Sequence, residues 1–229
     1  MFLKKTGVVL LLLIPLSSCT KTLRMEFNEG EMISLISAVE KENSFQMKQA
    51  YFMGIFPILV KHDIQQMGTL RVVENLTSEH DTIGFDVLKI PNTGVKQSIN
   101  VDRIDDWLHL RRMRPTIWNE LRIADYEASE DIMLELNSEK LYQVEAFWIN
   151  QDFKQDFLNF AEESYETNSP VSQVLVLGKP NLYETLGTER APDYWVINEW
   201  EDRAPIDEWV KTKTNMIAVS KYNSWIIGI

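Results

Sequence analysis

The residues of this sequence that are best placed to do chemistry are polar side chains inside long apolar runs. Glu145 interrupts the run Leu141–Ile149, and Asn198 interrupts the aromatic run at 193–201. A carboxylate on a strand that is covered on both faces must be paired or must border a wet cavity, because burying an unpaired charge is costly. Glu145 therefore belongs either to a satisfied structural pair or to the floor of a ligand site. The candidate ligand-binding residues are Glu145, Asn198, Trp148 and Trp200.

Strand alternation limits which of these side chains can share a pocket. In the run at 193–201, Trp195 falls on the face opposite Asn198 and Trp200, so Trp148, Trp195 and Trp200 cannot all line one cavity. A long polar stretch at 178–192 precedes this run. Loops of this kind often close over a cleft, so we expect the ligand site in the downstream half of the chain.

The common catalytic and cofactor-binding motifs are absent from the sequence. It has no glycine-rich dinucleotide loop, no phosphate-binding P-loop, no HExxH zinc motif and no GxSxG nucleophile motif. The three histidines, His62, His80 and His109, have no spacing that suggests a shared metal. Each is most simply a polar residue of a helix end or a loop. We therefore expect no metal and no cofactor, and no catalytic residue can be named.

The elements that must position these side chains recur in the same order in two halves of the chain. The run Leu141–Ile149 is typical of a strand, and it leads into an amphipathic helix around 153–161. Further strands are expected at 171–177, 193–201 and 224–229, with a helix at 206–217. The upstream copy has expected strands at 32–39, 69–74, 81–90 and 121–126, with helices from 45 onward and at 101–110. This order is β-α-β-β-α-β twice, and the alternative is two unrelated α+β halves.

This pattern resembles the dimeric α/β-barrel superfamily of ferredoxin-like domains. The resemblance covers most of the chain, and it is closest in the downstream segments VSQVLVLGKP and PDYWVINEWEDRAPIDEW. It implies an α+β fold with two tandem ferredoxin-like units, at 31–130 and 131–229, that form a fused barrel. In that arrangement the helices lie outside, and two four-stranded sheets face one another.

The superfamily includes cofactor-free monooxygenases, isomerases, haem proteins and members of no known activity. Its haem-binding tandem members use a histidine in the downstream domain, and this chain has none there. Its monooxygenase members rely on Asn, Trp and His around the pocket, and here only Asn198 and nearby tryptophans are available. We therefore expect a ligand-binding or interaction module. The alternative is a cofactor-independent monooxygenase or isomerase that acts on a small organic molecule.

The amino terminus carries the most specific motif of the chain. Two lysines are followed by an apolar run at 8–14, which is too short to span a bilayer as a helix, and by the tetrapeptide LSSC that ends at Cys19. This resembles the lipobox of bacterial lipoproteins. It implies a signal peptide at 1–18, acylation of Cys19 with fatty acids such as palmitate, and a tether at 19–30. The alternative is an ordinary signal peptide or hydrophobic anchor with an incidental cysteine.

The composition limits the partners and the location that the sequence supports. Cys19 is the only cysteine, so no disulfide forms within the chain. The net charge of −11 disfavours nucleic acid and anionic lipid surfaces as partners of the folded part. The expected partners are the lipid bilayer, through acylated Cys19, and a small-molecule ligand. Thr20 after the cysteine favours the outer membrane if the source is Gram-negative, and the oligomeric state is not indicated.

The upstream helix contains an unusually apolar stretch at 50–60. It has no charged residue, and a helix that is apolar all round is normally buried between layers. We therefore expect this helix to be largely buried, either between the two halves or at a dimer interface, with a kink at Pro57. Insertion into a membrane is the other interpretation, but the stretch is short and is flanked by charged residues.

Overall fold

The structure, a computed structural model, describes residues 22–102, 104–155, 157 and 170–229. The upstream elements that the sequence predicted are present with shifted bounds, and a helix at 93–102, where none was expected, precedes the one predicted at 101–110. They are β2 (Met32–Glu40), α1 (Phe45–Lys61), β3 (Gln65–Asn75), β4 (Gly84–Ile90), α2 (Thr93–Asp102), α3 (Ile104–Ile117) and β5 (Trp118–Glu127).

The downstream elements follow the same plan. They are β7 (Leu141–Ile149), β8 (Ser172–Leu177), β10 (Tyr194–Trp200), α5 (Ala204–Thr214) and β11 (Val219–Gly228). A short 3-10 helix, Gln151–Phe153, follows β7, and most of the helix predicted after it lies outside the described residues.

The order of strands in space confirms the fold class. The upstream strands lie in the order β5-β2-β4-β3 and the downstream strands in the order β11-β7-β10-β8. If the four strands of each unit are numbered in chain order, both units have the spatial order 4-1-3-2, and neighbouring strands are antiparallel. Each half is therefore a ferredoxin-like β-α-β-β-α-β unit.

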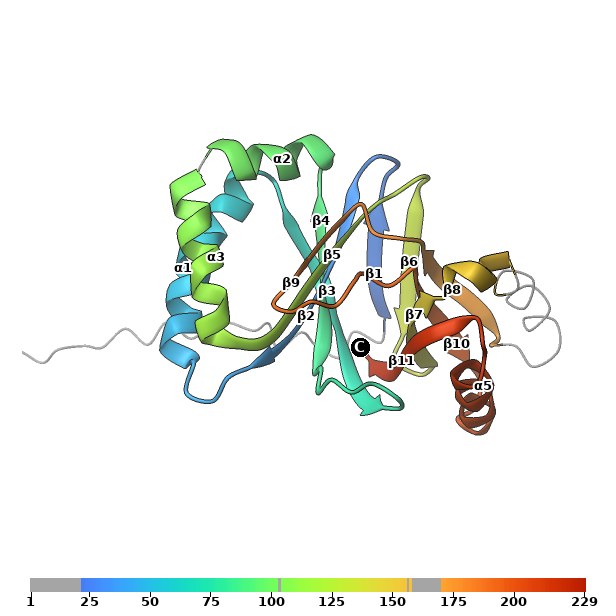
Figure 1. The fold of residues 1–229 in the computed structure, drawn as a ribbon. Coiled ribbons are helices and arrows are strands. Elements are labelled where there is room, and N and C mark those ends of the chain that lie inside the picture. Colours follow the sequence, from blue (N-terminus) through green and yellow to red (C-terminus); the bar gives the residue numbers. More distant parts are fainter. Residues whose placement is uncertain (1–21, 103, 156, 158–169) are drawn as a thin grey trace, which may run out of the picture.

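The two units share one sheet, which corrects the expectation of two separate sheets. Strand β11 of the second unit pairs with β3 of the first, and β9 (Leu182–Thr185), from the segment after β8, pairs with the outer edge of β5. The result is one nine-stranded sheet that curls into a barrel, with helices α1 and α3 outside one part and α5 outside the other (Figure 1).

The core inside the barrel is built from both units. The ring of Phe85 on β4 lies edge-on against Trp195 on β10 and Trp225 on β11, with ring centroids 5.6 and 5.1 Å apart. The side chains that alternate to the other face of each sheet pack under the outer helices, where α1 and α3 cover β5 and α5 covers β10 and β11. The inner faces of the two units thus face one another, as predicted, although their edges are hydrogen-bonded.

Part of the segment expected as a tether is a strand. Residues Thr22–Phe27 form β1, which pairs with β6 (Ile132–Asn137) in a separate two-stranded sheet. Met25, Leu134 and Leu136 of this sheet are buried in the barrel core. The alternation of apolar and charged residues in both segments explains this ribbon, since one face packs on the barrel and the other faces solvent. The boundary near residue 130 therefore precedes a strand that belongs to neither ferredoxin-like unit.

Helix α1 is not the buried helix that the sequence predicted. It buries Tyr51, Ile55 and Ile58, but Met53 is 69% exposed and Val60 is 75% exposed. The expectation was wrong because strands, rather than helices, make the contact between the two units, so α1 lies on the outside of the first unit (Figure 1). Pro57 lies within the helix. In the described part of the chain, no helix is both long and apolar enough to cross a membrane.

Candidate functional site

A cavity of about 480 Å³ opens at one mouth of the barrel, between the two units. The first unit contributes His80 from the loop between β3 and β4, and Glu120 and Arg122 from β5. The second unit contributes Trp148 from β7 and Lys221 from β11. The segment 185–190, at the end of β9 and after it, forms the remaining wall. Because both units supply side chains, this site exists only in the assembled barrel.

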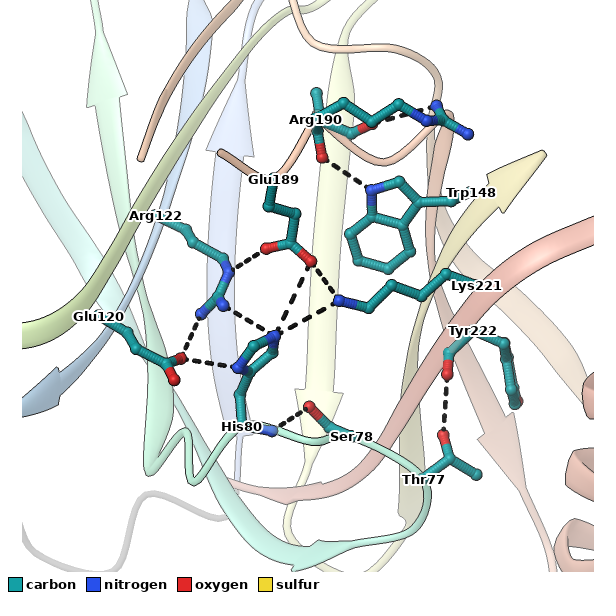
Figure 2. A network of polar contacts seen from close by, with 11 residues as sticks. Thr77, Ser78, His80, Glu120, Arg122, Trp148, Glu189, Arg190, Lys221 and Tyr222 are labelled. Carbon is teal, nitrogen blue, oxygen red and sulfur yellow. Dashed lines mark hydrogen bonds and ion pairs between the residues drawn. The ribbon is translucent and has the colours of Figure 1, made fainter. Parts of the chain in front are cut away.

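Two cations from different units converge on one carboxylate in this cavity (Figure 2). Arg122 donates from Nε to Glu189 Oε2 at 2.6 Å, and Lys221 Nζ donates to the other oxygen of the same carboxylate. The Lys221 ammonium also lies 4.9 Å from the centre of the Trp148 ring. Burial raises the pKa of the Glu189 carboxyl, but hydrogen bonds from Lys221 and Arg122 outweigh it, so the pKa lies below its ordinary value. Glu189 is therefore ionised at neutral pH.

The contacts of His80 indicate which ring nitrogen carries the proton. Nε2 lies 2.8 Å from Arg122 Nη2, and a guanidinium can only donate, so Nε2 accepts. In the neutral imidazole the proton then lies on Nδ1, which is 2.8 Å from Glu120 Oε2 as an ion-pair contact rather than a well-aligned hydrogen bond. His80 thus presents a lone pair toward the two cations and is oriented by a carboxylate behind it (Figure 2).

A small chamber of about 50 Å³ lies below the mouth, inside the barrel. Arg122, Trp148 and His80 border both spaces. Small side chains account for the chamber. Ala124 lies two residues after Arg122 on β5, and Ala146 lies two residues before Trp148 on β7, so each alanine points to the same face as its larger neighbour. The layer of side chains below the mouth therefore contains small residues and leaves a space.

The next layer of the barrel closes the chamber with aromatic residues. Tyr126 on β5 and Trp225 on β11 are 3% and 4% exposed, and both line the chamber. Tyr183 on β9 lines it as well, and burial raises the pKa of Tyr183 to about 12. The chamber is therefore lined by aromatic rings together with the polar side chains of Ser37, Thr82 and Asn223.

The residues named from the sequence lie mainly elsewhere, in a closed cluster beneath α5. Glu145 is fully buried, and its carboxylate accepts hydrogen bonds from Tyr222, Asn198 and Trp209, the last at 2.9 Å. Burial raises the pKa of Glu145 above its ordinary value, although these hydrogen bonds and Lys213 oppose the shift. Of the two alternatives given for Glu145, a satisfied structural pair or the floor of a ligand site, this arrangement agrees with the first.

Trp200 joins that cluster, but Trp148 does not. Trp200 Nε1 donates to Gln143 Oε1 at 2.9 Å and its ring packs against Trp209. Trp148 points to the opposite face of β7, where its Nε1 donates to the backbone oxygen of Arg190 at 2.7 Å. The structure therefore brings together three of the four candidates and places the fourth at the barrel mouth. Within the cluster, Asn198 Oδ1 has no hydrogen-bond partner among the described residues.

The polar segment 178–192 is only partly the loop that the sequence predicted. Its central residues are strand β9, which pairs with β5, while residues 186–190 line the cavity. The predicted association of this segment with a cleft is thus found, but at the junction of the two units rather than within the downstream half. Of the residues at the mouth, His80 was interpreted from the sequence as a polar residue of a helix end or a loop, and Arg122, Glu189 and Lys221 were not singled out, because each alone resembles an ordinary charged surface residue.

Comparison with known proteins adds structures of similar fold at very low sequence identity. No family model matches the chain, and no curated protein is similar in sequence. Among solved structures, an anthrone oxidase-like protein aligns with a TM-score of 0.48 at 10% identity, over 90% of this chain and 94% of its own. A proposed monooxygenase from Lactobacillus acidophilus NCFM gives 0.36 at 10% identity, over 87% and 93%. A chlorite dismutase variant from Candidatus Nitrospira defluvii gives 0.45 at 8% identity, over 89% and 93%.

Proposed function

We propose that the protein binds a small organic carboxylate at the mouth of the barrel. The observation that carries this proposal is the convergence of Arg122 and Lys221, from different units, on one flat anion beside an indole ring. That anion is at present the carboxylate of Glu189. A free carboxylate has the same shape and charge, so it can replace Glu189 between the same donors. Trp148 then offers an apolar face to the body of the ligand.

The location of Glu189 supports an exchange of this kind. Glu189 lies in the segment after β9, with exposed Gly187 and Thr188 just before it. Replacing its contacts therefore requires movement of a short surface segment and not of the barrel. The two cations come from strands β5 and β11 and stay in place. A ligand would thus meet a preformed pair of donors, which lowers the cost of binding.

The test is calorimetric titration of the protein with benzoate and related monocarboxylates. Arg122→Gln should weaken binding about tenfold or more, since a charge-assisted donor is lost. Glu189→Gln should instead strengthen binding, because it removes the competing charge while keeping a side chain of the same size. Arg203→Gln is the matched control: Arg203 is also paired with two carboxylates, Glu74 and Asp207, but away from the mouth. Weaker binding by Glu189→Gln would contradict the exchange.

A second function, a cofactor-independent isomerase or monooxygenase, is favoured by one observation. His80 presents the lone pair of Nε2 to the cavity and has Glu120 against Nδ1, which is the arrangement of a general base and its orienting carboxylate. A ligand carboxylate that takes the Arg122 Nη2 hydrogen bond now made to His80 would leave Nε2 able to take a proton, with the backbone of β5 unmoved. His80→Gln should then retain binding and abolish exchange of ligand C–H hydrogens with deuterium in D₂O, which NMR detects. Exchange that persists in this variant would exclude His80 as the base.

The amino-terminal motif supports a further part of this proposal, namely that the binding module is a lipid-anchored protein of the bacterial envelope. Cys19 lies three residues before Thr22, the first described residue, at which β1 begins. An acyl chain on Cys19 would hold the barrel close to the bilayer. Metabolic labelling with an alkyne fatty acid should mark the wild-type protein and leave Cys19→Ala unlabelled. Label in the variant would exclude acylation at this cysteine.

A further inference from the structure

The chamber below the mouth contains hydrogen-bond donors that have no acceptor. Tyr126 Oη and Trp225 Nε1 are buried, and neither has a hydrogen-bond partner in the described part of the chain. An indole N–H can only donate. Burial raises the pKa of Tyr126, so its hydroxyl keeps its proton and remains able to donate. The hydroxyl of Tyr183, which lines the same chamber, also has no hydrogen-bond partner among the described residues, and because buried polar groups are normally paired, these three groups need an explanation.

We propose that this chamber binds the carbonyl oxygen of a ligand, with Tyr126 and Trp225 as the donors. This inference rests on the proposed function, because it concerns the far end of the molecule whose carboxylate lies between Arg122 and Lys221. A carbonyl oxygen has two lone pairs and brings no hydrogen of its own. It therefore satisfies two donors and creates no new unpaired group.

The dimensions of the two spaces restrict the ligand class. The chamber, at about 50 Å³, has room for a small substituent, and the mouth, at about 480 Å³, has room for a ring. Arg122 and Trp148 border both spaces, so a single short molecule can reach from one to the other. The ligand class is thus a keto acid with a ring or a short apolar body between its carboxylate and its carbonyl group.

Two compounds of equal shape test the carbonyl directly. 4-Acetylbenzoate and 4-isopropenylbenzoate have the same carboxylate and the same ring, and they differ in a C=O group against a C=CH₂ group. The wild-type protein should bind 4-acetylbenzoate about tenfold more tightly, because only the oxygen satisfies the buried donors. Calorimetric titration of each compound measures this preference.

Variants of the two donors should remove the preference without removing binding. Tyr126→Phe deletes a hydroxyl that has no partner among the described residues, so the fold should be retained, and the preference should fall by most of its value. Trp225→Phe removes the other donor and should act in the same direction. The matched control is Tyr142→Phe, whose hydroxyl contacts Asn137 and Glu199 outside the chamber; it should leave the preference unchanged.

The outcomes separate this inference from the proposed function. If the wild-type protein binds both compounds equally, the carbonyl site is wrong while the carboxylate site stands. The same holds if both donor variants keep the full preference, or if a crystal structure with 4-acetylbenzoate shows the acetyl group outside the chamber. If neither compound binds and Arg122→Gln has no effect on any monocarboxylate, the proposed function itself is wrong and this inference fails with it.

Discussion

Two glutamates of this protein show how the surroundings of a carboxylate decide its role. Glu145 is surrounded by neutral donors, from Tyr222, Asn198 and Trp209, and is closed off beneath α5. Glu189 is held by two cations at the edge of a cavity. The first arrangement is closed to an outside anion, since the carboxylate is fully buried with its donors. The second can be exchanged, since an outside anion can satisfy the same cations.

The closed cluster should reveal itself through stability. Glu145→Gln replaces one acceptor oxygen with an NH₂ group that faces donors, so the free energy of unfolding should fall by roughly 1–3 kcal/mol. Glu208→Gln, on the exposed side of α5, should change it by less than about 0.5 kcal/mol. Urea denaturation monitored by circular dichroism measures both. If the free energy of unfolding changes as little in Glu145→Gln as in the control, Glu145 would instead be a hydrated group that faces a ligand site.

Lys213 predicts a specific pH dependence of stability. Burial lowers the pKa of Lys213 to about 8, against an ordinary value of 10.5, although the nearby Glu145 carboxylate opposes the shift. Between these values the unfolded chain holds the proton and the folded chain has lost it. The unfolded state thus binds more protons, and the free energy of unfolding contributed by Lys213 rises as the pH rises from about 8 to 10.5.

This dependence is measured against a variant that cannot titrate. Denaturant titrations at several pH values should give a steeper rise above pH 8 for the wild-type protein than for Lys213→Met. The difference in slope between the two curves should vanish below about pH 7, where both the folded and the unfolded wild-type protein carry the charge. A parallel pair of curves across the whole range would show that the ammonium titrates as if it were in water.

The site could be predicted from sequence only in part, for a physical reason. Glu145 stands out because it interrupts an apolar run, and that signal reports burial rather than function. His80, Arg122, Glu189 and Lys221 come from four separate segments, and each is flanked by residues that give no signal. The pairing of β5 with β2 and of β11 with β3 within the shared sheet brings these side chains together, and a local sequence pattern does not predict pairing between distant strands. One usable signal was the long polar segment before the third downstream strand.

At the scale of elements, α1 combines a packed face with an exposed apolar face. Ile58 is 1% exposed and Met53 is 69% exposed, although both are apolar and lie in the same helix. Ile58→Ala should therefore lower the free energy of unfolding by about 2–4 kcal/mol, while Met53→Ala should change it by less than about 0.5 kcal/mol. Chemical denaturation of the two variants tests this. An equal loss in both would mean that the outer face is covered in solution.

The sequence predicted the eight strands of the two repeats because these are long and apolar, and their order specifies the units. It missed β1, β6 and β9, which have four to six residues and contain charged or polar side chains at alternate positions. Such strands depend on an edge that is already present, namely β5 for β9, and on each other for β1 and β6. Their backbone partners are distant in sequence, so local propensity does not indicate them.

At the scale of the molecule, the shared sheet and the shared core predict that the two units unfold together. Phe85 of the first unit packs between Trp195 and Trp225 of the second. Phe85→Ala should cost roughly 3–5 kcal/mol and should still give one transition, with tryptophan fluorescence and far-ultraviolet circular dichroism coincident. Val73→Ala, at a 61% exposed position of β3, is the control and should have little effect. Two resolved transitions would mean that the units are independent domains.

The position of β9 makes the two junctions of the barrel unequal. At one junction the second strand of the first unit, β3, pairs directly with the last strand of the second unit, β11. The equivalent pairing of β8 with β5 is replaced, because β9 occupies the edge of β5. A duplicated chain would otherwise carry two equivalent mouths related by a pseudo-twofold axis. Here the segment that contains β9 breaks this symmetry, and the residues after β9 also form a wall of one mouth. The fold therefore predicts one ligand per chain, with a hyperbolic rather than a cooperative binding isotherm.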